Sequence, residues 1–410
     1  MLPIYLILTA AFVLIAWRDL HAGLLLLIAL LPSYLLRTEI FSVPTTLLEM
    51  LLVVFVIVWF IVRRPRLSNF FVLPPHFRLP LTLLLSASLI SVLVAPDLTA
   101  ALGVWKAYFL EPILLFLIIR FENLNPAHIF RALGLTALVL SIIAIAQWLT
   151  DAGIPIPWDI ERRVTSVFDY PNALGLFLGP IVVIGVMSWR TTNKWFWFFT
   201  IVLSAISIIL AQSEAAIVAV LATLVVAGLL NKQTRVKTFV TVLVAIAIIT
   251  ASPWRGFVVE KLTLQDYSGQ VRLTQWSETI DMLGDRWLLG AGLSGYPTVF
   301  APYHQATHIE IFQYPHNILL NIWVELGLLG VIAFGLLAYQ VLRRLPTTSS
   351  TSSTLSTSPP LIAFFALLTM TIHGLVDVPY FKNDLAILTW ILLAIVFTYA
   401  PHETPAQKKI

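Results

Sequence analysis

Residues 313–330 read QYPHNILLNIWVELGLLG, and in this stretch a Pro-His-Asn triplet opens a long apolar run. Pro315 cannot continue a helix, so a helix is predicted to begin just after it, with Asn317 near the cap. The run is long enough to cross a bilayer as a helix. His316 is therefore expected at a membrane surface, with Glu325 roughly 13 Å inside the span.

Apolar runs of this kind recur along the whole chain. Of 410 residues, 59% are hydrophobic and 11% are charged, and the mean hydropathy is +0.91. A soluble domain is about half apolar and a quarter charged. Continuous runs predict helices, because a membrane barrel shows short alternating segments instead. The predicted fold is an all-α polytopic membrane protein with about 12–13 spans. These lie near 2–16, 22–36, 44–62, 79–95, 104–120, 129–149, 172–189, 195–211, 214–230, 236–251, 317–342, 361–376 and 384–400.

The positions of Lys and Arg predict the orientation of the chain. Basic clusters fall on one side, which is then the cytoplasmic side, and the loops 150–171 and 252–316 fall on the external side. The predicted organisation is an N-terminal membrane region, an external loop, a C-terminal membrane region and a cytoplasmic tail, at 1–251, 252–316, 317–400 and 401–410. The Ser/Thr/Pro-rich segment 346–360 is predicted to be a disordered cytoplasmic linker. The N-terminal run lacks a basic leader and a cleavage site, so it is expected to be a retained span.

The external loop 252–316 contains a predicted amphipathic helix. In RLTQWSETIDMLGDRW (272–287), apolar residues recur at steps of three and four and form one face. They are Leu273, Trp276, Ile280, Leu283 and Trp287. Two tryptophans favour a helix that lies on the outer membrane surface. Packing on an extramembrane part of the protein is the alternative.

Two ionisable residues of the opening stretch are candidates for chemistry. Imidazole titrates near neutral pH, so His316 could take a proton from an incoming hydroxyl; the alternative is a structural histidine. A carboxylate inside a span is costly unless it is paired or faces a wet cavity, so Glu325 is a functional candidate, with a packing contact as the alternative. Gly327 and Gly330 in the same run allow close helix approach.

Arginines in the external loops form a second group of candidates. Positive charge is disfavoured on this side, so Arg163 and Arg272 each need a reason to be there. Guanidinium groups bind phosphate bidentately and could hold a lipid diphosphate, although anchoring to lipid phosphate or a salt bridge is the alternative. Weaker candidates are Arg162, Arg255, Arg286 and Lys382. In HGLVDVP (373–379), His373 and Asp377 could orient a base or bind a sugar hydroxyl, or they could simply end a helix.

Two further patterns are weak. YHQATHIE (303–310) places His304 and His308 four residues apart, but it lacks the glutamate of a zinc H-E-x-x-H motif, so no metal is predicted. GAGLSG (290–295) matches a dinucleotide fingerprint by letter, but it follows an amphipathic helix instead of a strand and is interpreted as a turn. The chain has no cysteine, which excludes disulfide and thiolate chemistry.

The ordered set of motifs resembles the O-antigen ligase and O-antigen polymerase family of bacterial membrane glycosyltransferases. The resemblance rests on an arginine followed by Pro-Asn at the start of a span, in RVTSVFDYPNALG (163–175). It continues with RLTQW (272–276) and LLGAGLSGY (288–296), and ends with HNILLNIWVELGLLG (316–330). The order, the spacing and the many-span plan cover most of the chain.

The resemblance implies a function and a location. Family members take a glycan from undecaprenyl diphosphate on the outer face of the bacterial cytoplasmic membrane and transfer it to an acceptor hydroxyl, without a metal or another cofactor. By position, His316 would be the general base, and Arg163 and Arg272 would hold the diphosphate. Asn172, Asn317, Glu325, His373 and Asp377 would have supporting roles. The acceptor could be a glycan, a lipid core or a protein; membrane lipids are expected partners and nucleic acid is not.

One departure from the family and two rival classes stay open at this stage. Many relatives carry Ser-Arg near the ninth span, where this chain has Glu214 in AQSEAAIVAV (211–220). A polysaccharide or lipid transporter or flippase is the main rival to an enzyme, but inverted halves with broken helices are not apparent. A structural membrane anchor would not need Arg and His gathered on the external side.

Overall fold

The computed structural model describes residues 2–40, 43–66, 70, 73–189, 193–306, 308–344 and 358–399. Within these ranges the fold is helical apart from one antiparallel pair of short strands, β1 (Arg37–Ile40) and β2 (Val43–Thr46), in which Arg37 pairs with Thr46. The all-α prediction is confirmed. Most of the predicted linker 346–360, and the tail 401–410, lie outside the described residues.

The helices follow the apolar runs closely. The first half of the chain forms α1 (Leu2–Arg18), α2 (Leu20–Ala29), η1 (Leu31–Leu35), α3 (Leu47–Arg63), α5 (Pro75–Val94), α6 (Leu98–Trp105), η2 (Lys106–Leu110), α7 (Glu111–Glu122), α8 (Pro126–Thr150) and α9 (Pro171–Ser188). The second half forms α10 (Lys194–Leu210), α11 (Glu214–Leu230), α12 (Arg235–Ala251), α13 (Arg255–Leu262), α14 (Tyr267–Arg286), α15 (Tyr296–Phe300), η3 (Ala301–Tyr303), α16 (Ile318–Arg343), α17 (Pro359–His373) and α18 (Asn383–Tyr399).

Among the described residues, five helical segments are long and apolar enough to cross a membrane, and the bent pair formed by α12 with the segment 255–286 would make a sixth. The five are Pro75–Val94, Leu98–Glu122, Pro126–Thr150, Pro171–Ser188 and Ile318–Arg343. Six further apolar helices have only 10–17 residues. At 1.5 Å per residue, the longest of these reaches about 25 Å, less than the hydrocarbon core of about 30 Å. The chain is a polytopic membrane protein, as the apolar runs predict.

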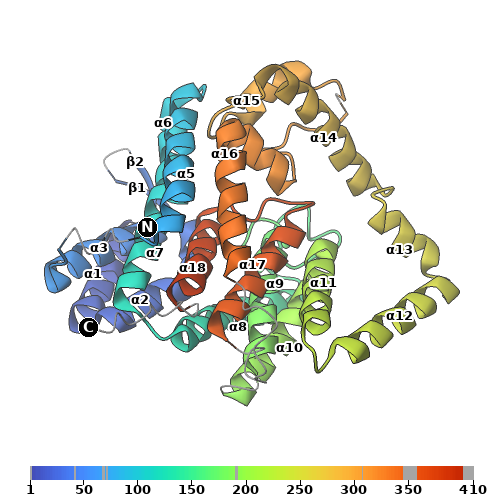
Figure 1. Ribbon diagram of the computed structural model, residues 1–410, viewed down its shortest axis with the longest axis horizontal. Coiled ribbons are helices and arrows are strands. Elements are labelled where there is room, and N and C mark those ends of the chain that lie inside the picture. Colours follow the sequence, from blue (N-terminus) through green and yellow to red (C-terminus); the bar gives the residue numbers. More distant parts are fainter. Residues whose placement is uncertain are drawn as a thin grey trace, which may run out of the picture.

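The core of the molecule surrounds α9 and α18. Helix α9 is buried along most of its length and packs against α8, α10, α11 and α17. Helix α18 is buried from Leu385 to Phe397 and packs against α7 and α17. Helix α16 lies beside α5 (Figure 1). Helices α12 and α13 have no buried residue, and with α14 they run along one side of the molecule, away from the helical body (Figure 1).

The predicted amphipathic helix is present within α14, but its five apolar residues do not share one environment. Leu283 is buried, whereas Leu273, Ile280 and Trp287 are 40%, 58% and 53% exposed. The buried face is mixed in polarity and includes Gln275, Glu278, Thr279, Met282 and Leu283. Helix α14 therefore packs on the protein through one face and leaves a separate apolar strip uncovered. Packing on the protein, one of the two sequence-based alternatives, is confirmed for this face, and a position on the membrane surface stays a prediction.

The GAGLSG segment forms a turn that locks onto a break in α16. Gly327 departs from helical geometry with a φ of 65°, and the next N–H, of Leu328, donates to the Leu288 carbonyl at 3.0 Å. In return, the Ala291 N–H donates to the Val324 carbonyl at 2.7 Å. A Cβ on Gly327 would lie 2.3 Å from the Leu288 oxygen, so only glycine fits there. The turn prediction is confirmed.

Candidate functional site

The start of α16 is fastened to the loop between α17 and α18. The Asn317 side chain caps α16 by accepting from the N–H groups of Leu319 and Leu320, and its amide donates to the Leu375 carbonyl at 2.9 Å. The Ile318 N–H donates to the Gly374 carbonyl at 2.7 Å. The predicted cap is confirmed, and these bonds bring His316 to the 374–382 loop although 57 or more residues separate them along the chain.

His316 is held with one ring nitrogen toward a carboxylate. Its Nδ1 lies 3.6 Å from Oδ1 of Asp377, an ion-pair distance that is too long for a hydrogen bond. The rings of Phe312 and Tyr314 stand edge-on to the imidazole, with centroids at 5.0 and 4.9 Å. The backbone of His316 has a φ of 48°, a conformation that is uncommon for residues other than glycine. The side chain is 22% exposed, so it is accessible to a substrate while its neighbours restrict the ring.

Asp377 carries a negative charge next to this histidine. The carboxylate is only 2% exposed. Burial by itself raises the pKa of Asp377, but His316, His373 and the Val378 N–H, which donates to Oδ1 at 2.8 Å, stabilise the anion more strongly. The pKa of Asp377 therefore lies below its ordinary value. A carboxylate on one side of an imidazole can orient it and stabilise the imidazolium that forms when the ring accepts a proton.

Arg272 and His373 complete this group. The Arg272 Nε donates to the Val376 carbonyl at 3.1 Å, and another guanidinium nitrogen donates to the Ser268 hydroxyl at 2.8 Å. His373 is buried at the end of α17, within Coulombic range of both Asp377 and Arg272. The fold thus brings together four predicted site residues, Arg272, His316, His373 and Asp377, from three separate segments.

Arg163 occupies a different place. Its Nε donates to the Ala211 carbonyl at 3.1 Å, and its guanidinium stacks over Trp158 at 5.0 Å. In the described part of the chain, its contacts run to the α10–α11 turn and to Glu161, and none reaches His316 or Arg272. Asn172 is half-buried in the first turn of α9. The structure does not bring the two predicted arginines into contact.

A pair of tyrosines joins two of the three Tyr-Pro dipeptides of the chain. Tyr170 and Pro171 open α9, Tyr314 and Pro315 precede α16, and the hydroxyls of the two tyrosines are hydrogen-bonded at 3.1 Å. The ammonium of Lys382 lies 4.2 Å from the centre of the Tyr170 ring. Helix α14 also holds this segment, because Gln275 and Trp276 donate to the carbonyls of Tyr314 and Pro315 at 3.1 and 2.7 Å.

A polar cavity of about 1020 Å³ lies on the other side of the tyrosine pair. Glu325 lines it, and its carboxylate accepts the Ser294 N–H at 2.8 Å. Asn321 also lines it and is fully buried, yet neither atom of its amide has a hydrogen-bond partner among the described residues. Other polar residues of the lining are Tyr34, Arg37, Thr38, Glu39, Thr45, Thr46, Glu49, Lys106, Tyr108, Asp169, Tyr170, Ser294, Gln313, Tyr314, Lys382 and Asn383.

The sequence analysis did not single out several residues that define this cavity. Asn321 lies one helical turn after Asn317, within an apolar run. A polar amide inside a span is a functional candidate for the same reason as the carboxylate of Glu325. Tyr170 and Tyr314 were visible as a repeated Tyr-Pro before a span. Arg37 lies between two predicted spans on the side assigned as external, where a basic residue needs a reason.

The weak histidine motif has a structural explanation. One ring nitrogen of His304 pairs with Glu278 at 2.9 Å, and the other hydrogen-bonds the Ile309 carbonyl at 2.8 Å. The hydrogen bond to Glu278 raises the pKa of His304. Within the described ranges, no group of three or more His, Cys, Asp or Glu side chains comes together that could hold a metal ion. The pair instead ties α14 to the segment that follows η3.

Glu214, the departure from the family pattern noted in the sequence, forms an ion pair. Its carboxylate lies 3.1 Å from the Lys261 ammonium, which also pairs with Asp266 at 2.9 Å. The contact joins the start of α11 to the end of α13. Positive charge at this place therefore comes from Lys261 of α13, which two carboxylates neutralise.

Comparison with known proteins bears directly on this arrangement. Residues 199–335 match the family model described as O-antigen ligase. Over these residues the chain is similar to O-antigen ligases. The matched region runs from α10 into α16 and includes Arg272, the GAGLSG turn, His316 and Glu325, whereas Asp377 and Arg163 lie outside it. The match supports the O-antigen ligase and polymerase family and a glycosyltransferase-like function in general. No curated protein matches the chain.

Proposed function

We propose that the protein transfers a glycan from undecaprenyl diphosphate to an acceptor hydroxyl at the extracytoplasmic face of the bacterial cytoplasmic membrane. The observation that carries this proposal is the group formed by His316, Asp377 and Arg272, next to a polar cavity. The similarity to O-antigen ligases supports the reaction class, and the external position predicted for loops 150–171 and 252–316 supports the side of the membrane.

His316 is the proposed general base. Its Nδ1 faces Asp377, which leaves Nε2 for the acceptor. The acceptor oxygen attacks the anomeric carbon of the donor sugar and gives its proton to Nε2. The bond from the anomeric carbon to the phosphate oxygen breaks, and undecaprenyl diphosphate leaves with that electron pair. Asp377 stabilises the imidazolium, in the way a buried carboxylate does in other base–orienter pairs.

Arginine is the proposed stabiliser of the departing diphosphate. Two guanidinium nitrogens of Arg272 donate hydrogen bonds to Val376 and Ser268. These bonds fix the orientation of the guanidinium group. A guanidinium presents five donors in a planar fork that suits phosphate oxygens. Arg163 is proposed as a second phosphate contact from the loop before α9. Asn172 and His373 are proposed to support these groups by position, and Glu325 by shaping the cavity.

The polar cavity is the proposed chamber for the sugar. Tyrosine rings, amides and carboxylates recognise carbohydrate through stacking and hydrogen bonds, and this lining offers all three. Asn321 is the most informative member, because a buried amide without partners is costly unless a ligand satisfies it. A sugar hydroxyl could accept from its NH₂ group and donate to its carbonyl.

The test is release of undecaprenyl diphosphate from a lipid-linked oligosaccharide by purified protein in nanodiscs, with and without EDTA. His316→Ala is expected to lower the rate about 10² to 10⁴-fold, the usual contribution of a general base. His128→Ala, an exposed histidine at the start of α8, is the matched control and keeps the wild-type rate. Release that is independent of His316 would contradict the base assignment. Movement of intact donor across the bilayer without release would favour the transporter alternative.

A further inference from the structure

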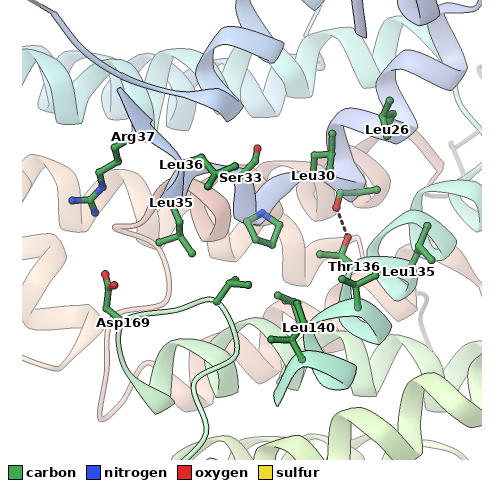
Figure 2. A pocket seen from close by; sticks show the side chains of 15 residues that line it. Leu26, Leu30, Ser33, Leu35, Leu36, Arg37, Leu135, Thr136, Leu140 and Asp169 are labelled. Atoms are coloured by element: carbon green, nitrogen blue, oxygen red, sulfur yellow. Dashed lines mark hydrogen bonds between the residues drawn. The ribbon is translucent and has the colours of Figure 1, made fainter. Parts of the chain in front are cut away.

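An apolar groove of about 680 Å³ runs between α2, η1 and α8. Its walls are mainly leucine, valine and isoleucine side chains, and several are largely exposed, including Leu135 at 51%, Val139 at 50% and Leu36 at 42%. The Thr136 hydroxyl donates to the Ala29 carbonyl at 2.8 Å and ties the two walls together (Figure 2). Exposed apolar side chains on a membrane helix face lipid chains, so this groove is open to the bilayer.

The groove has a charged end. Arg37 and Asp169 lie at one end of it, whereas Leu26, Leu135 and Thr136 lie at the other (Figure 2). Arg37 is exposed, and no described residue forms an ion pair with it. The groove is apolar along its length and ends at an exposed arginine beside Asp169, so the guanidinium can meet the anionic head of an amphipathic ligand whose apolar chain fills the groove.

Three residues that line this groove also line the polar cavity. Leu35, Arg37 and Asp169 line both the groove and the cavity that holds Asn321 and Glu325. The two spaces therefore adjoin, and these shared residues lie where an apolar surface gives way to a polar one. Arg37 lies in the hairpin between two predicted spans, on the external side, where basic residues are disfavoured without a ligand.

We propose that this groove holds the polyprenyl chain of the lipid-linked donor, with Arg37 as a contact for its phosphates. This inference rests on the proposed function for the identity of the lipid. The chain would enter sideways from the bilayer between α2 and α8, so that the head group reaches the polar cavity. Phospholipid acyl chains offer similar apolar surface, and the experiment separates the two occupants.

The proposal is tested by substitutions that fill the groove with a tryptophan ring. Val139→Trp places a bulky ring in the groove, whereas Ile142→Trp places the same ring on α8 at a comparably exposed position, 57% against 50%, outside the groove lining. Leu135→Trp is a second groove variant. Binding of undecaprenyl diphosphate and of farnesyl diphosphate is measured by native mass spectrometry, after size exclusion confirms folded protein. We expect the groove variants to bind undecaprenyl diphosphate at least about tenfold more weakly, with Ile142→Trp unchanged. The short-chain compound should bind all four proteins similarly.

The phosphate contact has its own pair of variants. Arg37→Ala should weaken binding of undecaprenyl diphosphate and leave binding of undecaprenol, which has no phosphate, unchanged. The control is Arg131→Ala, which changes an exposed arginine near the start of α8.

Equal binding of undecaprenyl diphosphate by wild type, Val139→Trp and Leu135→Trp would overturn the proposal. So would displacement of undecaprenyl diphosphate by phosphatidylglycerol at equal concentration, because the groove would then be a site for bilayer lipid. Binding is measured without turnover, so a protein that binds the donor in the groove but releases no glycan product would support the groove and contradict the proposed reaction.

Discussion

The hydroxyl groups of Tyr170 and Tyr314 are joined by a hydrogen bond of 3.1 Å, although 144 residues separate them. Each tyrosine stands just before a proline; Pro171 is the first residue of α9, and Pro315 lies three residues before the start of α16. The bond therefore connects two Tyr-Pro dipeptides that the sequence shows separately. It fixes the loop that carries His316 against the start of α9, at the wall of the polar cavity.

This link predicts energetic coupling between the two tyrosines. Tyr170→Phe and Tyr314→Phe each remove one hydroxyl, so each should lose a net hydrogen bond worth about 1 kcal/mol. The double variant should lose little more than either single variant, because the bond can be lost only once. Thermal unfolding of the four proteins measures this cycle. Additive losses would mean that the hydroxyls act independently.

Asp377 predicts a pH dependence with a defined sign. Its pKa is lower in the folded protein than its ordinary value of 3.8. The stabilisation it provides is therefore complete above that ordinary value and is lost as the pH falls through the lower, folded value. Wild type should lose stability on acidification below pH ~4, and Asp377→Asn should lose less over the same range. Thermal unfolding across this range measures the difference.

The same substitution should also slow transfer. Asp377→Asn removes the charge that stabilises the imidazolium of His316, so we expect turnover to fall about a hundredfold or more, with a smaller change in KM for the acceptor. Asp281→Asn changes an exposed carboxylate on α14 and serves as the control. A variant with normal turnover would show that Asp377 has a structural role alone.

Two glycines of α16, Gly327 and Gly335, should affect stability in opposite directions when replaced by alanine. Gly327→Ala forces a side chain into a φ of 65° and against the Leu288 carbonyl, so it should destabilise the protein by about 2 kcal/mol or more. Gly335→Ala lies in the same helix, where an added Cβ meets no atom within 4 Å, and should raise stability by up to about 1 kcal/mol. Denaturation of both variants in the same detergent is the measurement. Equal effects would mean that the break at Gly327 is not required.

Asn321 predicts opposite effects on stability and activity. Its buried amide has no protein partner among the described residues, so Asn321→Leu should leave stability unchanged or raise it by about 1 kcal/mol. Loss of the amide should raise KM for the glycan donor, because a sugar hydroxyl then loses its partners. Melting temperature and donor titration are read on the same preparation. Destabilisation with an unchanged KM would show that the amide serves the fold instead.

Most helices of this protein could be predicted from the sequence. The predicted spans 195–211 and 214–230 correspond to α10 (Lys194–Leu210) and α11 (Glu214–Leu230) within a residue or two. Agreement is close because a helix in lipid must satisfy its own backbone, so an apolar run and its flanking Pro or Asn define its ends. Several predicted spans correspond to apolar helices of 10–17 residues, which are shorter than the segments that pass the length test for crossing a membrane.

The sequence by itself determined the helical membrane class, the cap of α16 and the candidate residues at helix ends, since these follow from local composition and spacing. Only the tertiary structure decided that His316 meets Asp377, that Arg163 lies apart from Arg272, and that Arg37 stands where the groove joins the cavity. These relationships depend on how loops from distant helices dock through backbone carbonyls and single side chains. Such contacts leave no periodic signal in the sequence, because each is made once and across a long stretch of chain.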